Sequence, residues 1–234
     1  MISPTDAKLA ARLKPLALRP PGTLLVNEVY RSIQGEGLYA GLPCTFIRLT
    51  ACHLRCSYCD SRYSFGQGDL VALDELVGRA LALGDTVVEV TGGEPLLQAE
   101  VYPLMHQLVE AGRKVLLETS GAVGIEQVPP GVHVILDLKT PGSGEHEANL
   151  WSNLELLKPT DELKFVICDR RDFDWSLNAI GEHALIERCA VLMSPAFGLV
   201  NPTDLAAWIL ESGRPIRLQI QLHKQLWAPD ARGV

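Results

Sequence analysis

The sequence has no uninterrupted apolar run that approaches the ~18 residues a membrane-spanning helix requires. Residues 1–21 are polar and broken by prolines, so they contain no apolar core of a secretory signal peptide. The chain also has no internal repeat and no low-complexity tract. We therefore expect a globular protein that works in the cytoplasm and has no membrane partner.

Positive charge is in deficit, because 21 Lys and Arg residues oppose 28 Asp and Glu residues, for a formal net charge of −7. Proteins that capture nucleic acid need clustered Lys and Arg side chains to neutralise phosphates. A nucleic-acid partner is therefore not expected. With 234 residues, 47% of them hydrophobic, the chain is long enough to bury one large core.

A disulfide framework is not expected either, because the cytoplasm keeps thiols reduced. The six cysteines then indicate metal binding or simple packing. Cys44, Cys168 and Cys189 lie in predicted strands or next to them, and we expect them to be small core residues.

Apolar, β-branched runs alternate along the chain with segments of helical period. The strand candidates are residues 24–30, 43–50, 86–91, 114–118, 133–138, 162–167, 189–193 and 216–221. The helix candidates are residues 70–83, 98–111, 172–184 and 202–211. Such a pattern predicts a parallel sheet covered by helices, either a partial barrel or an open doubly wound sheet. We expect one domain over residues 23–234, preceded by a flexible leader over residues 1–22.

Cys52, Cys56 and Cys59 follow directly on a predicted strand with the spacing C-x3-C-x2-C. Three thiols this close in sequence can hold one metal centre from a single loop. A structural zinc site uses four ligands and usually recruits a second pair at a distance, and the other cysteines form no such pair. An iron–sulfur cluster with three thiolates keeps one iron free for a small molecule. Two alternatives stay open: a zinc site completed by His53, and a redox pair of Cys56 and Cys59.

The cysteine spacing, with Tyr58 before the last cysteine, resembles the hallmark of the radical S-adenosylmethionine (SAM) enzymes. The resemblance implies a partial (β/α)6 TIM-like barrel in a single domain, and a [4Fe–4S] cluster on Cys52, Cys56 and Cys59. It also implies that SAM chelates the free iron and is cleaved by one electron to a 5′-deoxyadenosyl radical and methionine. The protein would then supply placement and exclusion of water.

Four polar segments end predicted strands, at the edge where parallel sheets build their sites. They are residues 91–95, 118–121, 137–144 and 193–197. In the first segment, two glycines would let the backbone approach a ligand, and Glu94 could accept a hydrogen bond from an ammonium group. The series predicts a cofactor cradle along one edge of the sheet.

Two flanking segments narrow the resemblance to one family. Residues 27–37 (NEVYRSIQGEG) and 221–229 (QLHKQLWAP) are similar to segments of the 7-carboxy-7-deazaguanine synthases, and the likeness runs over residues 25–229. That family converts 6-carboxy-5,6,7,8-tetrahydropterin to 7-carboxy-7-deazaguanine with loss of ammonia, on the way to queuosine and other 7-deazapurines. The resemblance implies a catalytic use of SAM, a Mg²⁺ ion, a homodimer and a reductant such as flavodoxin or ferredoxin.

The resemblance also implies site residues by position. The pterin would contact Ile33, Gln34, Gly35, Thr91 and Pro229, and its carboxylate would meet the forked guanidinium of Arg48. A buried Arg48 would in any case require an acidic partner. SAM would be lined by Tyr58, Cys59, Asp60, Gly93, Glu94, Ser120, Asp137, Leu138, Lys139, Ser194, Pro195, Ala196 and Phe197.

The sequence departs from the family at two places. Ser61 stands where the family commonly has the threonine that binds Mg²⁺, and it keeps a hydroxyl oxygen for the ion. Asp137, Leu138 and Lys139 stand where many members carry Ser-Pro-Lys, so the cofactor contact there could differ.

Two other functions stay open from the sequence. One is a radical SAM activating enzyme that abstracts hydrogen from a partner protein, which would share the cysteine loop. The other is a metal-binding module without catalytic activity. The segments over residues 34–37 and 223–229 favour the pterin reaction, because they would close a pocket over a small ligand.

Overall fold

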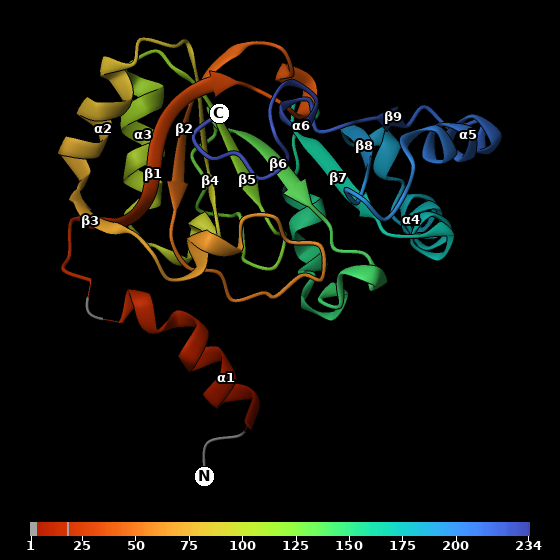
Figure 1. Cartoon of the computed structure of the whole chain (residues 1–234), viewed down its shortest axis with the longest axis horizontal. Helices are drawn as coiled ribbons and strands as arrows, with labels where there is room; N and C mark the ends of the chain where they lie inside the picture. Colours follow the sequence, from red (N-terminus) through yellow and green to blue (C-terminus); the bar gives the residue numbers. More distant parts are fainter. Residues whose placement is uncertain (1–3, 18) are drawn as a thin grey trace.

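In the computed structural model, which describes residues 4–17 and 19–234, those residues form a nine-stranded sheet (Figure 1). The spatial order is β3–β1–β2–β4–β5–β6–β7–β8–β9, with β1 antiparallel to β2 and β3 and the others parallel. The strands are β1 (Thr23–Ile33), β2 (Pro43–Leu49), β3 (Asp69–Ala72), β4 (Val87–Gly92), β5 (Lys114–Thr119), β6 (His133–Asp137), β7 (Glu162–Ile167), β8 (Ala190–Pro195) and β9 (Arg217–Leu218).

The helices cover the outer face of this sheet in two groups (Figure 1). The first group is α2 (Leu73–Ala82), which packs against β1 and β2, and α3 (Val101–Glu110), which packs beside α2 against β5. The second group is α4 (Arg170–Glu182) and α5 (Pro202–Ser212) near β7 to β9. The six strands β2 and β4 to β8, with their crossovers, form the predicted partial (β/α)6 barrel. Between β5 and β7 the crossovers are loops and 3-10 turns. No helix in the described residues is long and apolar enough to cross a membrane.

The strand sequences place apolar and charged side chains in different layers of the barrel interior. Alternate residues of a strand point to the same face. Toward the N-terminal ends of the strands, Cys44, Phe46, Val87, Leu116 and Ile135 pack inside as a small apolar core, and beside them the buried His133 of β6 and Glu162 of β7 bond each other at 2.7 Å. Further along the same strands the inward positions are charged: Arg48, Glu89, Glu118, Asp137 and Lys164. The interior is therefore a polar chamber above an apolar plug.

The structure corrects two predicted elements. Residues 70–72, which we expected in a helix, belong to β3 and pair with β1, so α2 begins only at Leu73. The strand predicted over residues 216–221 is reduced to β9, an edge strand that pairs only with β8. The backbone beyond β9 turns inward instead and leads into α6 (His223–Leu226), an element we did not predict.

The predicted leader contains a helix that its sequence did not suggest to us. Helix α1 (Pro4–Leu13) precedes β1, and Arg12 donates to the carbonyl of His53 at 2.5 Å. Further along, Gly22 N donates to Glu100 at 3.1 Å. Residues 1–3 and 18 of the leader lie outside the described residues, and the flexibility of the leader stays a prediction.

Candidate active site

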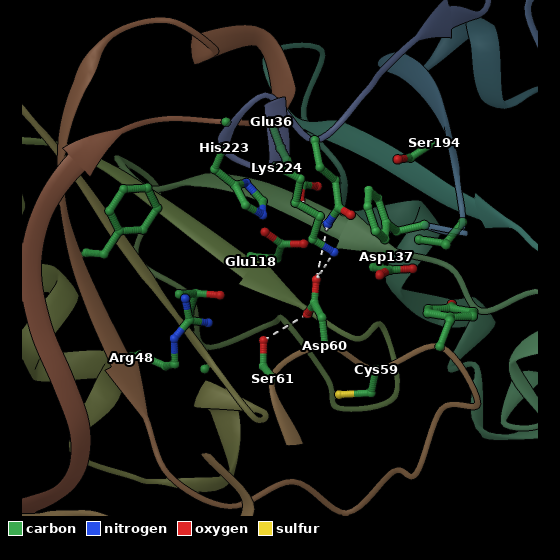
Figure 2. A pocket seen from close by; sticks show the side chains of 18 of the residues that line it. Glu36, Arg48, Cys59, Asp60, Ser61, Glu118, Asp137, Ser194, His223 and Lys224 are labelled. Atoms are coloured by element: carbon green, nitrogen blue, oxygen red, sulfur yellow. Dashed lines mark hydrogen bonds and ion pairs between the residues drawn. The ribbon is translucent and has the colours of Figure 1, made fainter. Parts of the chain in front are cut away.

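A cavity of about 370 Å³ opens at the C-terminal ends of the parallel strands (Figure 2). Its wall combines the cysteine loop after β2, the ends of β4 to β8, the segment after β1 and the chain beyond β9. Loops at this edge build the sites of parallel α/β proteins. All the predicted site residues lie in this wall except Glu94 and Leu138.

The cysteine loop enters the cavity through a turn of unusual backbone conformation. Ala51 has φ = 79°, in the left-handed region, and its amide donates to Ser64 O at 2.9 Å. The loop then carries Cys52, Cys56 and Cys59, all three of which line the cavity. Burial raises the pKa of all three thiols, that of Cys52 to about 12. A metal centre is therefore what would hold them as thiolates at neutral pH.

The described residues suit an iron–sulfur cube better than a single ion. No three His, Cys, Asp or Glu side chains among them stand close enough to bind one metal ion. A cube takes one thiolate per iron, so its ligands stand further apart than those of zinc. His53 in particular forms no such group with the cysteines in the described part of the chain, which speaks against the zinc site that it would complete.

Charge and unpaired polar atoms next to the cysteines fit a cluster and a small polar cofactor. Lys139 lies beside the cysteine loop, with its Nζ 6.0 Å from the ring of Tyr58, and it pairs with Asp137 at 2.8 Å. The Tyr58 hydroxyl and Asp137 Oδ1 are buried without a partner among the described residues. Buried polar atoms are rarely left unpaired, so these two atoms are available to a ligand in the cavity.

Two glycines bring the end of β4 against the cysteine loop. A Cβ on Gly93 would lie 2.1 Å from Ala51 O, and one on Gly92 would lie 2.2 Å from Leu49 O. Gly92 also has φ = 136°, a conformation that other residues rarely adopt. The two glycines therefore allow a close approach to the loop that carries the cysteines, while their predicted approach to a ligand stays a prediction.

Glu94 and Leu138 are the two predicted cofactor contacts that the structure places outside the cavity wall. Glu94 is fully buried, and its carboxylate accepts hydrogen bonds from Thr119 Oγ1 at 2.9 Å and Ser120 N at 2.8 Å. It thus fastens the end of β5 and has no free face toward the cavity. Leu138 is fully buried in the main apolar core, and only its neighbours Asp137 and Lys139 face the cavity.

Arg48 has the acidic partner that its burial requires. Its Nε donates to Glu28 at 2.7 Å, and a second guanidinium nitrogen donates to the Tyr30 hydroxyl at 2.9 Å. Burial alone would lower the pKa of Arg48, but Tyr30, Tyr63 and Glu28 raise it. The guanidinium therefore stays charged at one end of the cavity, where Figure 2 shows it apart from Cys59.

Asp60 joins the cysteine loop to the chain beyond β9 (Figure 2). It accepts hydrogen bonds from Ser61 Oγ at 3.0 Å, from Lys224 Nζ at 2.7 Å and from Gln221 Nε2 at 3.3 Å. Burial would raise the pKa of Asp60, but Lys224 and these hydrogen bonds lower it to about 2. Asp60 is consequently an anion, and Ser61 places its hydroxyl beside that anion.

The floor of the cavity carries charged residues. Glu36 and Glu118 lie in segments that the sequence analysis singled out, whereas Glu89 and Lys164 received no role there. Lys164 lies between Glu36, at 3.0 Å, and Glu118, with which it forms a second ion pair. Glu89 accepts a hydrogen bond from the Gln34 amide, and burial, with Glu118 nearby, raises the pKa of Glu89 to about 8. A charged residue at an inward position of a mainly apolar strand was the signal that could have revealed Glu89 in β4 and Lys164 in β7.

The segment after β1 and the segment after β9 meet across the cavity. Leu222 N donates to Gly35 O at 3.0 Å, and a Cβ on Gly35 would lie 2.6 Å from His223 Nδ1. Glu36 accepts from Gln221 at 2.9 Å. Beyond α6, Pro229 and the residues that follow it also line the cavity.

Comparisons with known proteins agree with this site. A model of the radical SAM superfamily matches residues 46–140. The 7-carboxy-7-deazaguanine synthase of Koribacter versatilis (strain Ellin345) is 45% identical over 224 residues, covering 89% of this chain and 99% of that protein. The enzyme of that name from Chlorobaculum tepidum is 42% identical over 214 residues, covering 90% and 97%. The crystal structure of QueE from Escherichia coli has the same fold, with a TM-score of 0.73 at 22% identity, covering 90% and 99%.

The partial barrel, the cysteine loop on its first parallel strand and the superfamily match define a radical SAM enzyme, with a [4Fe–4S] cluster and SAM as its cofactors. The two relatives then specify the group within that superfamily. The chain belongs to the 7-carboxy-7-deazaguanine synthase family.

Proposed function

We propose that this chain converts 6-carboxy-5,6,7,8-tetrahydropterin to 7-carboxy-7-deazaguanine with loss of ammonia, in the biosynthesis of queuosine and other 7-deazapurines. The observation that carries the proposal is the cavity itself, in which residues 34–37 and 221–223 join to form one part of the wall and the cysteine loop forms another. A cavity of this size suits a small bicyclic ligand beside a nucleoside cofactor. Family membership gives the same substrate class.

Cys52, Cys56 and Cys59 would hold the cluster, which together with SAM supplies the carbon radical that takes a hydrogen atom from the substrate. The chain's own residues do the remaining work. Arg48 offers a fixed cation for the substrate carboxylate, and Gln34 is held in one orientation by Glu89. The joined segments over residues 34–37 and 221–223 exclude water from this end of the cavity.

The remaining SAM contacts belong to the same proposal. Tyr58, Asp60, Gly93, Ser120, Asp137, Lys139 and residues 194–197 form the part of the wall nearest the cysteine loop and the ends of β4 to β8. The unpaired oxygens of Tyr58 and Asp137 support polar contacts there. Glu94 would act through Ser120, whose amide and hydroxyl it holds.

Mg²⁺ at Ser61 is a further part of the proposal. The Ser61 hydroxyl faces the cavity next to the Asp60 carboxylate, so oxygen atoms suited to a hard cation are present. Mg²⁺ commonly keeps several waters and takes few protein ligands, which agrees with a single hydroxyl contribution. We also propose a homodimer in the cytoplasm, reduced by a flavodoxin or a ferredoxin, on the basis of family membership alone.

The rival functions have less support. An enzyme that acts on a partner protein needs an opening for a polypeptide. In this protein the C-terminal residues 229–234 instead form part of the cavity wall. A metal-binding module without activity gives no reason for a charged chamber above the apolar plug.

The test is anaerobic reconstitution with iron and sulfide, followed by carboxytetrahydropterin, SAM, Mg²⁺ and dithionite. We expect 7-carboxy-7-deazaguanine by mass spectrometry. Cleavage of SAM without that product would refute the assignment, and a colourless, zinc-loaded protein would refute the radical chemistry as well. Cys56→Ala should lose the cluster, while the matched control Cys168→Ala, which removes a half-buried thiol outside the cavity wall, should keep it.

A further inference from the structure

The segment beyond α6 returns to the cavity after α6 has been fixed in place. Lys224 holds α6 to Asp60 at 2.7 Å, and residues 229–234 then form part of the cavity wall. Figure 1 shows this segment, in dark blue, turning back toward the central strands from the far edge of the sheet. We call residues 229–234 the tail.

The tail places one guanidinium group beside another. Arg232 lies over the ring of Tyr63, with Cζ 4.0 Å from the ring centroid, and Arg48 lies 5.9 Å from the same centroid. All three side chains line the cavity. Two arginines that are far apart in the sequence, one in β2 and one in the tail, thus lie against the same tyrosine.

The charge balance at this end of the cavity gives Arg232 a distinct part. Arg48 is already neutralised by Glu28 at 2.7 Å, and the Tyr63 hydroxyl also donates to Glu28, at 2.8 Å. Arg232 forms no ion pair with any carboxylate of the described residues. An anion entering this region meets a balanced Arg48–Glu28 pair, and taking a carboxylate out of water requires an uncompensated cation. Of the two arginines around Tyr63, Arg232 is the one without a carboxylate partner in the described part of the chain, so it can supply the positive charge that the Arg48–Glu28 pair lacks.

We propose that Arg232 is a second ligand of the substrate carboxylate, so that the tail completes the carboxylate site that Arg48 begins. The inference rests on the proposed function, because it takes the carboxylated pterin as the ligand. A guanidinium suits this part, because it presents paired donors that match the two oxygens of a carboxylate. It also makes the tail a determinant of specificity for carboxylated over uncarboxylated pterins.

A binding cycle on the reconstituted enzyme, with cluster and SAM bound, tests this inference. The probes are 6-carboxypterin and pterin, oxidised compounds that differ in the carboxylate. With wild-type protein, 6-carboxypterin should bind more tightly than pterin. Arg232→Ala should weaken 6-carboxypterin binding about 10- to 100-fold and leave pterin binding unchanged, since hydrogen bonds between charged groups are worth roughly that factor. Arg232→Lys should restore part of the loss.

The control is Arg217→Ala, which removes an exposed arginine of β9 outside the cavity wall and should change neither affinity. Equal weakening of both probes in Arg232→Ala would show that Arg232 only tethers the tail to Tyr63, and no weakening would show that it does not contact the ligand. Either result overturns the inference. Wild-type turnover assayed in parallel separates the two proposals: absence of deazaguanine refutes the proposed function, whereas product formation with an unchanged binding ratio refutes only the part given to Arg232.

Discussion

Removal of the Lys164 ammonium is the perturbation whose outcome the structure specifies best. Lys164 is almost fully buried and is shared by Glu36, at 3.0 Å, and Glu118. Lys164→Met keeps most of the apolar stem but leaves two carboxylates without their cation. Breaking a buried ion pair from one side costs about 3–5 kcal/mol. The side chains of Glu36 and Glu118 are 17% and 24% exposed. Because solvent screens partly exposed charges, we expect a loss near the lower end of that range.

The loss should be visible as a lower midpoint of thermal unfolding. For a chain of this size, a loss of about 3 kcal/mol corresponds to roughly 6–12 °C. The measurement is circular dichroism of the cluster-free protein at pH 5, 6.5 and 8. Arg79→Met, which breaks an exposed pair with Glu75, is the control and should cost less than ~1 kcal/mol.

The pH dependence provides a second check on the same variant. Without Lys164, burial raises the pKa of Glu36 and Glu118 in the folded state above their unfolded values, so the folded state binds more protons. Stability then falls as pH rises, and the deficit should be smallest at pH 5 and largest at pH 8. A midpoint within a degree of wild type, or a deficit that is constant from pH 5 to pH 8, would refute the reasoning.

Two further predictions concern Glu89 on the cavity floor and Gly93 against the cysteine loop. Burial, with Glu118 nearby, raises the pKa of Glu89 to about 8, above the unfolded value near 4.3, so this carboxyl costs stability as pH rises through that window. The stability of Glu89→Gln relative to wild type, measured by urea unfolding, should therefore increase from pH 5 to pH 8. A difference in unfolding free energy that stays constant with pH would contradict this. Gly93→Ala places a Cβ 2.1 Å from a backbone oxygen and should lower the free energy of unfolding by about 1–3 kcal/mol or more and reduce iron retention. Its control, Gly78→Ala, adds a methyl in open space on α2 and should stabilise by ~0.5–1 kcal/mol, and equal behaviour of the two would contradict the crowding at Gly93.

The parallel sheet could be predicted because its strands are buried on both faces and read as apolar runs separated by helical periods. The cysteine loop could be predicted for a different reason, since its three cysteines are close in sequence. Most of the wall then followed from one rule, that loops after parallel strands share an edge. The cavity wall contains Thr91, Asp137 and Ser194 as that rule requires.

The errors occurred where contacts between distant segments decided the outcome. Residues 69–72 are a strand because they pair with the open edge of β1. The local sequence of residues 69–72 does not indicate that partner. Glu94 lies outside the cavity wall and bonds Thr119 and Ser120, an arrangement that the local sequence did not indicate, and its contact with the cofactor stays a prediction. The inward charges Glu89 of β4 and Lys164 of β7 received no role from the sequence, because only the barrel brings them together with Glu36 and Glu118.

The join between residues 35–37 and 219–223 has a consequence for synthesis of the chain. Gly37 N donates to Gln219 at 2.7 Å, and Gly35 O accepts from Leu222 N at 3.0 Å. Residues 35–37 are therefore synthesised long before residues 219–223, the partners to which they bond. Contacts of such high sequence separation form late, because closing the intervening loop costs entropy before any contact offsets it. A nascent chain on the ribosome can therefore assemble its strands and its apolar plug, yet it reaches a binding-competent chamber only after release.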